Sequence, residues 1–170
     1  MESVNWYFRV NDYCKTLASL YGISVIKVAG IMSALSPNNT FKSNIKSLEA
    51  FLKTGGNCKV STYGMQKEKA LTIYNSHANI GIEEVKDILG DGKKSGFKTR
   101  AFFDNIVRPS ESQEVTIDLW MIRWAGLEGS LTPKRYREIS QKVVELANSL
   151  NLLPHQVQAK LWVDVRGNAW

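Results

Sequence analysis

Helical spacing of apolar residues runs through almost the whole of this 170-residue chain. Apolar side chains recur at intervals of three and four residues, and turn-forming Gly, Pro, Asn and Ser separate the segments. No run shows the strict alternation of a half-buried strand. We therefore expect an all-α protein, a helical bundle forming a single domain over residues 1–170 that could divide into two small lobes around a cleft. A chain of this length can bury a core without disulfides.

Two segments predict helices most clearly. Residues 25–35 are apolar on most sides, which indicates a central buried helix ended by Pro37. Thr132-Pro133 predicts the start of a long helix, with Thr as cap and Pro in the first turn. We expect the other helices at about residues 3–20, 40–54, 69–74, 83–89 and 116–126, from 97 up to a loop at 108–112, and from 154 onward. Side chains expected on buried faces include Trp6, Tyr13, Leu17 and Leu20, and Tyr136, Ile139, Val143, Leu146, Ala147 and Leu150.

Charge and cysteine usage limit the classes of partner. The net charge of +6 favours phosphate-bearing partners such as nucleic acid, through steering and counterion release. The two cysteines and two histidines lie in unrelated segments, so we expect no metal and no cofactor, and two ordinary thiols. The start of the chain lacks a signal-peptide pattern, and no apolar run reaches membrane-spanning length. We therefore expect a soluble, cytoplasmic protein without a membrane partner.

A Gly- and Lys-rich turn at residues 90–96 opens into a helix start at Phe97. Glycines permit close backbone approach, and a helix N-terminus presents free N–H groups to an anion. Lys93, Lys94, Lys98 and Arg100 add positive charge at the same place. The turn can be interpreted as a grip for a backbone phosphate or, equally, as a solvated basic turn.

Asp118 is a lone carboxylate among apolar residues at the start of a predicted helix. One interpretation is a capping residue, stabilised by the free N–H groups and dipole of the first turn. The other is a pocket carboxylate that stabilises developing positive charge or orients a water molecule. By spacing alone, capping is the favoured interpretation.

In order along the chain, these features resemble the helix-hairpin-helix DNA glycosylase superfamily, which contains endonuclease III, adenine glycosylase and oxoguanine glycosylase. Residues 35–40 are similar to the Leu-Ser-x-Gln-x-Thr-like segment that follows a buried helix in that family. Lys69-Ala70 matches a Lys-Ala pair before the hairpin, Gly96-Phe97-Lys98 the hairpin turn, and residues 116–120 the segment with the essential aspartate. The hairpin and catalytic segment would span about residues 83–126. The chain also resembles short phage proteins with Ser-Pro-Asn and Thr-Ile-Asp motifs.

The resemblance implies a role for each matched residue. Asp118 would be the catalytic carboxylate that helps a base leave its sugar. Asn38 would fill the gap left by a flipped base, and Gly96 would hold phosphate through its backbone. Trp120, at the place of a family histidine, would line the base pocket. The residues implied to contact nucleic acid are Asn38, Asn39, Lys93, Lys94, Gly96, Phe97, Lys98 and Arg100.

Departures from the family pattern bear on the type of reaction. In the ungapped alignment, Arg100 occupies the position of the lysine that forms an imine in bifunctional members. Arginine cannot form that imine, which favours simple hydrolysis of the glycosidic bond. A two-residue gap would instead give that role to Lys98, and this alternative stays open. Lys98 also replaces the second hairpin glycine, and the four-cysteine cluster of endonuclease III is missing.

The leading hypothesis from sequence is a monomeric, monofunctional N-glycosidase that acts on a modified or damaged base in DNA. The substrate could also be a nucleoside or nucleotide, since the basic excess is modest. The alternative is a non-catalytic nucleic-acid-binding or phage anti-defence module on the same scaffold. That module would need the basic hairpin but not Asp118.

Overall fold

The computed structural model describes residues 2–166, and the side chains of all of these except residues 2, 119, 120, 165 and 166. Within this range the chain is helical, with no strand, which confirms the expected all-α class. The 3-10 turn Glu2–Asn5 comes first, followed by α1 (Trp6–Tyr21), α2 (Val25–Ala34), α3 (Phe41–Thr54), α4 (Gly64–Tyr74), α5 (Ile82–Leu89), α6 (Phe97–Val107), α7 (Leu119–Trp124), α8 (Pro133–Leu150) and α9 (Pro154–Arg166).

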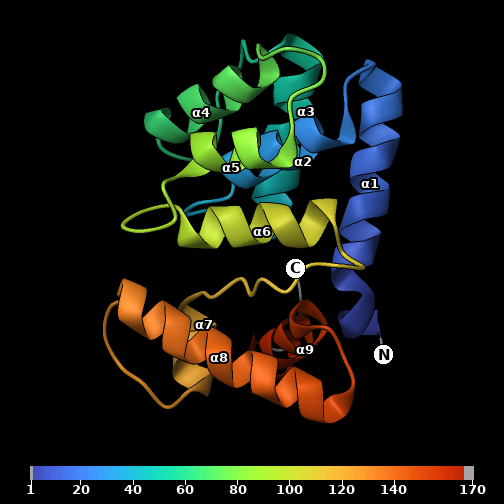
Figure 1. Cartoon of the computed structure of the whole chain (residues 1–170). Coiled ribbons are helices and arrows are strands. Elements are labelled where there is room, and N and C mark those ends of the chain that lie inside the picture. The colour runs from blue at the N-terminus through green and yellow to red at the C-terminus, as the bar shows by residue number, and fades with distance from the viewer. Residues whose placement is uncertain (1, 167–170) are drawn as a thin grey trace.

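Residues 108–118, which we call the extended segment, separate two groups of helices; they begin with a turn at residues 109–111 and then run without helix or strand. Figure 1 shows α1 to α6 on one side of this segment and α7 to α9 on the other. The buried apolar side chains divide in the same way, into one cluster around α2 and a second between the segment, α7, α8 and α9. We call these groups the N-terminal lobe (residues 2–107) and the C-terminal lobe (residues 119–166). Helix α9 also contacts the first turn of the chain and α1, and so joins the lobes.

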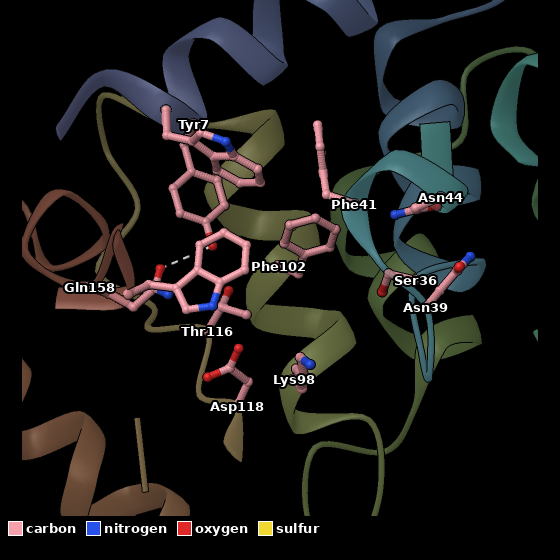
Figure 2. Close-up of a pocket in the computed structure, with 12 residues that line it drawn as sticks. Tyr7, Ser36, Asn39, Phe41, Asn44, Lys98, Phe102, Thr116, Asp118 and Gln158 are labelled. Atoms are coloured by element: carbon pink, nitrogen blue, oxygen red, sulfur yellow. Dashed lines mark hydrogen bonds between the residues drawn. The ribbon is translucent and has the colours of Figure 1, made fainter. Parts of the chain in front are cut away.

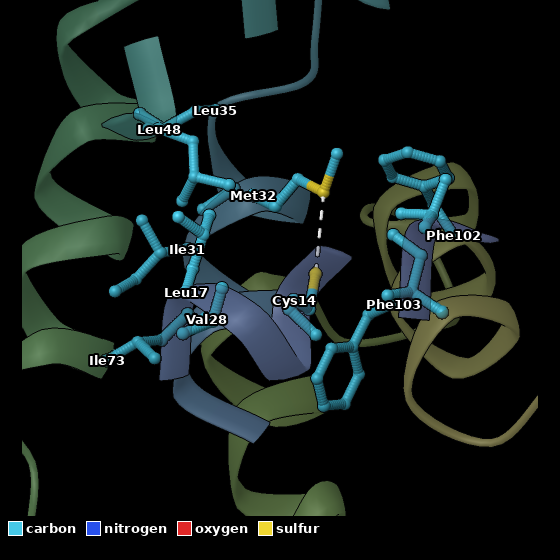
Figure 3. Packing of buried hydrophobic residues seen from close by; sticks show 14 of the residues in the cluster. Cys14, Leu17, Val28, Ile31, Met32, Leu35, Leu48, Ile73, Phe102 and Phe103 are labelled. Atoms are coloured by element: carbon cyan, nitrogen blue, oxygen red, sulfur yellow. Dashed lines mark hydrogen bonds between the residues drawn. The ribbon is translucent and has the colours of Figure 1, made fainter. Parts of the chain in front are cut away.

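Helix α2 is the centre of the N-terminal lobe, as its apolar sequence predicts. Val28, Ile31 and Met32 are fully buried, and Figure 3 shows them among side chains from several other elements. A Cβ on Gly30 would lie 2.8 Å from a Val85 methyl group, so α5 can approach α2 this closely only because residue 30 has no side chain.

The two cysteines are free thiols. Cys14 is fully buried, with its Sγ atom 3.9 Å from the Met32 Sδ atom (Figure 3), and burial raises the pKa of its thiol to about 12. Cys58 is half-buried. In the described part of the chain no single helix is long and apolar enough to cross a bilayer; Ser3–Tyr21 and Val25–Ala34 meet that criterion only as a pair, bent by 114°.

Most of the predicted helix ends are confirmed. The Thr40 side chain caps α3 by accepting a hydrogen bond from Ser43 N at 3.1 Å, and Thr132 caps α8 in the same way through Arg135 N at 3.2 Å. Gly22 ends α1 in the left-handed conformation. Each of these ends follows from local chemistry alone, because the side chain or the glycine satisfies backbone groups that the helix leaves open.

Two predicted core positions are wrong. Leu20 is 69% exposed and Leu150 is 53% exposed, although both fit the apolar spacing of their helices. Each belongs to the last two residues of its helix. The buried residues of α1 include Val10, Cys14 and Leu17, and none follows Ala18. Position in the helix therefore decides burial here as much as periodicity does.

Candidate functional site

Buried ionic groups fix the start of the extended segment against α6. The Asp104 carboxylate is fully buried and pairs with Lys86 Nζ at 2.7 Å and with Arg108 Nη2 at 2.9 Å. The Ser112 hydroxyl also donates a hydrogen bond to this carboxylate. Burial by itself raises the pKa of Asp104, but the hydrogen bonds from Lys86 and Ser112 and the nearby positive charges outweigh it and lower the pKa. Asp104 is therefore an anion at neutral pH.

The next residue, Asn105, fixes the middle of the segment. Its Nδ2 atom donates to Ser112 Oγ and to the Glu114 carbonyl, both at 2.9 Å, and its Oδ1 atom accepts from Thr116 Oγ1 at 2.8 Å. From the other side, the Tyr136 hydroxyl donates to the Val115 carbonyl at 2.5 Å. Side chains from both lobes thus satisfy the backbone of residues 114–117, which takes an extended course instead of a helical one.

Asp118 follows directly on this fixed segment. The helix predicted over residues 116–126 begins only at Leu119, so Asp118 precedes the helix and does not lie in its first turn. The reason is that residues 114–117 are held extended, and Asp118 then caps the helix: its Oδ1 atom accepts a hydrogen bond from Met121 N at 3.2 Å. The capping interpretation is therefore confirmed.

The same half-buried carboxylate also lines a cavity of about 110 Å³ between the lobes. Figure 2 shows this cavity and the side chains around it. The lining residues come from α1, α3, α6, α9, the segment 108–118 and the loop before α3: Trp6, Tyr7, Ser36, Asn39, Phe41, Asn44, Lys98, Phe102, Thr116, Asp118, Gln158 and Trp162. Capping and lining the cavity are compatible roles, because a carboxylate has four lone pairs.

Aromatic rings form much of the cavity wall. The Trp6 ring centre lies 4.8 Å from that of Phe41 and 5.7 Å from that of Trp162, in edge-to-face contacts, and 6.3 Å from that of Phe102, which is stacked. Rings at such spacings present flat apolar faces and hold one another in place. The cavity therefore suits a planar, apolar-faced group that carries polar atoms at its edge.

Lys98 lines the same cavity as Asp118. In Figure 2 the two side chains lie at the end of the cavity away from Tyr7 and Phe41. Ser36 and Asn39, from the loop between α2 and α3, line the cavity as well. The structure thus brings together Asp118, Lys98 and Asn39, which the resemblance drew from three distant parts of the sequence.

Tyr7 contributes a neutral hydroxyl group to the cavity. Its hydroxyl donates to Gln158 Oε1 at 3.1 Å. Burial raises the pKa of Tyr7 well above its usual range, and the negative charge of Asp118 adds to the shift, while a hydrogen bond with Thr116 opposes it. The phenol therefore stays protonated and acts as a fixed dipole near Asp118.

The Gly- and Lys-rich turn has a different organisation from the cavity. The Asp91 Oδ1 atom accepts hydrogen bonds from the backbone N–H groups of Lys93 and Lys94 at 2.8 Å and of Ser95 at 3.0 Å. These bonds hold the pKa of Asp91 well below its usual range. Three N–H groups that could bind a phosphate are therefore occupied by a carboxylate of the protein itself.

The glycines in this turn allow two backbone segments to lie in close contact. A Cβ on Gly90 would lie 2.5 Å from the Gly96 Cα atom, and one on Gly96 would lie 2.6 Å from the Gly90 Cα atom. Gly96 also has a positive φ of 76°. Arg100 braces the same turn, since its Nη1 atom donates to the Gly90 carbonyl at 2.8 Å and lies 3.6 Å from an Asp87 carboxylate oxygen. Arg100 does not line the cavity with Asp118.

The remaining sequence-predicted residues lie elsewhere. Lys93 and Lys94 are exposed at the tip of the turn, and Phe97 packs against Tyr136, with ring centres 5.5 Å apart. Asn38 is exposed in the loop before α3 and adopts a positive φ of 54°. The side chain of Trp120 lies outside those that the structure describes, so its place in a base pocket stays a prediction.

Sequence reasoning missed most of the cavity wall. Tyr7, Phe41, Asn44, Phe102, Thr116, Gln158 and Trp162 were not predicted as site residues. For Trp6 the core was the favoured prediction and stacking on a base the alternative; the residue is 2% exposed and also lines the cavity. Asn44 shares a helix face with Leu48 and Phe51, and a polar residue at such a position is a signal in the sequence that could have indicated a site.

Comparison with known proteins gives a family assignment for nearly the whole chain. Residues 1–169 match DUF7178, which is described as a family of unknown function. The chain belongs to this family. No curated protein and no solved structure matches it. For this member of DUF7178, the function has to be inferred from the cavity itself.

Among the side chains that the structure describes, no group of three His, Cys, Asp or Glu residues is placed to bind a metal.

Proposed function

We propose that this protein is an N-glycosidase that removes a modified or damaged base from DNA by hydrolysis, with Asp118 as the catalytic carboxylate. The observation that carries the proposal is the position of Asp118 on a ring-lined cavity between the lobes. Such a cavity suits a base that has been flipped out of the stack, since enzymes that act on a base take it into a pocket of aromatic and apolar side chains.

The reaction follows from the charges at the cavity. As the bond between the base nitrogen and the sugar C1′ atom breaks, the electron pair leaves with the base, and positive charge develops on the sugar. The Asp118 anion stabilises this charge and orients a water molecule, whose oxygen bonds to C1′ while its proton is released. The departing base takes up a proton. Lys98, on the same cavity, supplies positive charge that suits the adjoining phosphates.

A second candidate reaction is favoured by the position of Lys98. Because Lys98 lines the cavity while Arg100 is bonded to the hairpin, Lys98 is the residue that could attack C1′. A bond between Nζ and C1′ would then form as the glycosidic bond breaks, and it would become an imine on ring opening. Borohydride reduction would trap this imine as a stable protein–DNA adduct. We expect no adduct if hydrolysis is the only reaction, and a Lys98-dependent adduct if the amine attacks.

The decisive test of the proposal uses variants that keep the helix cap. Asn and Ser cap helices about as well as Asp, so Asp118→Asn and Asp118→Ser should fold with unchanged stability. Base release should nevertheless fall by about 100-fold or more, the usual contribution of a positioned acid or base. The measurement is release of free base from oligonucleotides carrying a panel of damaged or modified bases, followed by chromatography.

The matched control is Glu138→Gln on α8, which removes an exposed carboxylate. It should leave base release unchanged. A non-catalytic binding module predicts a different outcome: no base released by the wild-type protein, and DNA affinity that is the same in Asp118→Asn. A nucleoside N-glycosidase would release base from free nucleosides, and its affinity for the substrate would depend little on salt.

A further inference from the structure

The Tyr136 hydroxyl contacts two backbone groups of the extended segment just before Asp118. It donates a hydrogen bond to the Val115 carbonyl at 2.5 Å and accepts one from Ile117 N at 3.2 Å. Ile117 directly precedes Asp118 in the chain. Two hydrogen bonds to one fixed group restrict both the position of this backbone and the direction in which it continues. The course of the chain at Asp118 therefore depends on a side chain of α8.

The same side chain contacts the start of α6. The Tyr136 hydroxyl oxygen lies 3.4 Å from the Phe97 carbonyl oxygen, and the rings of the two residues have their centres 5.5 Å apart. Phe97 is the first residue of α6 and directly precedes Lys98. Lys98 and Asp118 are the two charged residues among those that line the cavity. One tyrosine thus contacts the residue before each of them.

Tyr136 is itself held in a fixed place. It lies in the first turn of α8, where its backbone N–H donates to the carbonyl of the capping residue Thr132 at 2.9 Å. The residue is only 6% exposed. Burial raises the pKa of Tyr136 well above its usual range, and the negative charge of Asp118 adds to the shift, although the hydrogen bond from Ile117 N opposes it. The hydroxyl therefore keeps the proton that it donates.

We propose that Tyr136 is a positioning residue for the site, whose hydroxyl holds the backbone at Asp118 and the backbone at Lys98 at a fixed distance from each other. Tyr136 is not among the residues that line the cavity, so it acts through these two side chains. The role rests on the proposed function, because it takes Asp118 to act on a base bound in the cavity. A reacting group that moves by about 1 Å can slow a reaction by about 100-fold.

The first test is Tyr136→Phe, which removes only the hydroxyl group. The assay uses the full-length protein and an oligonucleotide whose base the wild-type protein releases. The maximal rate of base release should fall by about 10- to 100-fold, as expected for a misplaced reacting group. The DNA concentration that gives half of this rate should stay nearly unchanged, because no group that lines the cavity is lost. An unchanged maximal rate, or a change in the half-saturating concentration alone, would overturn the proposal.

The second test asks whether the effect of Tyr136→Phe depends on Asp118. If the hydroxyl acts by positioning this carboxylate, the double variant with Asp118→Asn should release base nearly as fast as Asp118→Asn alone. Two residues that act as a unit show such non-additive losses, whereas a general loss of structure multiplies with the loss of the carboxylate. Equal fold-losses from Tyr136→Phe in both backgrounds would contradict positioning.

The matched control is Tyr13→Phe. It also removes one tyrosine hydroxyl, which donates to Glu49 between α1 and α3. This variant should leave base release unchanged, and a loss equal to that of Tyr136→Phe would rule out a specific role. If Tyr136→Phe fails to fold, Phe97→Leu removes the ring that packs on Tyr136 and should lower the maximal rate instead. An unchanged rate in that variant would then overturn the proposal.

Amide hydrogen exchange separates this inference from the proposed function. The Ile117 N–H is bonded to Tyr136, and the Met121 N–H to Asp118. In Tyr136→Phe both should exchange about 10-fold faster, the effect of losing one hydrogen bond. Unchanged exchange at both groups would overturn the positioning role and leave the N-glycosidase proposal intact. Faster exchange in a protein whose wild-type form releases no base would support the hold on Asp118 and count against catalysis.

Discussion

The hairpin turn between α5 and α6 and the cavity between the lobes differ in how their polar groups are used. In the turn, the Asp91 carboxylate occupies three backbone N–H groups, and Arg100 is bonded to Gly90. Among the residues that line the cavity, Trp6 and Asn44 each have one buried polar atom, Nε1 and Oδ1, without a partner among the described residues. The protein itself thus satisfies the tip of the turn, although the start of α6 has no side-chain cap.

This difference teaches that positive charge and glycine do not by themselves make a phosphate site. The glycines of the turn allow Gly90 and Gly96 to approach each other, and that contact needs no ligand. Function is better sought where a protein leaves buried polar groups unpaired, since such groups lower its stability unless a ligand satisfies them. Trp6 and Asn44, which line the cavity together with Asp118, carry such groups.

The largest expected effect concerns the ion pairs that support the cavity. Asp104→Asn removes the buried carboxylate next to Lys86, whose side chain is only 9% exposed, and leaves it only the exposed Glu83 carboxylate at 3.9 Å. Breaking a buried pair in this way costs about 3–5 kcal/mol, so we expect the free energy of unfolding in urea to fall by that order. The matched control is Asp87→Asn, whose carboxylate is 81% exposed and 3.6 Å from Arg100; it should change stability by less than about 0.5 kcal/mol. Equal losses in both variants would contradict the assignment.

The dependence of stability on acid pH tests the carboxylates of both regions, Asp104 beside the cavity-supporting segment and Asp91 in the turn. The pKa values of Asp104 and Asp91 are both lower in the folded protein than in free aspartate. As the pH falls below about 4, these carboxyls take up protons first in the unfolded chain. Stability that is fully present above that pH should therefore decline as the pH falls through the folded-state pKa values. Urea unfolding between pH 3 and 6 should show a shallower decline in Asp104→Asn and in Asp91→Asn, and an unchanged slope in both would refute the shifts.

A structural feature of this protein could be predicted from the sequence where it depends on residues that are close together along the chain. The central helix and the caps at Thr40 and Thr132 were predicted, because they depend on neighbouring residues. The start of α7 was not, because Asn105 and Tyr136, both far from it in sequence, hold the preceding residues extended. Most of the cavity wall was missed for the same reason.

The next prediction concerns the Asp91 carboxylate, which occupies backbone N–H groups that could otherwise bind an anion. Removing its carboxylate in Asp91→Ala leaves three N–H groups without that acceptor, and we expect the thermal midpoint to fall, though less than in Asp104→Asn. Inorganic sulfate or phosphate should then bind the vacated N–H groups and raise the midpoint of the variant. The wild-type protein should gain little from the same salt, and sodium chloride at equal ionic strength is the control. An equal gain in both proteins would mean that the turn is not filled by Asp91.

The smallest expected effect is the change in the salt dependence of DNA affinity when one lysine is removed, either at the turn or at the cavity. Lys93 and Lys94 are exposed at the tip of the turn, whereas Lys98 lines the cavity with Asp118. Each lysine that neutralises a phosphate contributes about 1 to the slope of log affinity against log salt. Lys98→Ala should therefore lower the slope by about 1 and reduce base release, while Lys93→Ala and Lys94→Ala should leave base release unchanged. Loss of base release in Lys93→Ala or Lys94→Ala, with full release in Lys98→Ala, would move the substrate from the cavity to the turn. The comparison is clean because all three substitutions remove one charge from the same short stretch of chain, so a general effect of net charge on DNA affinity would appear equally in each.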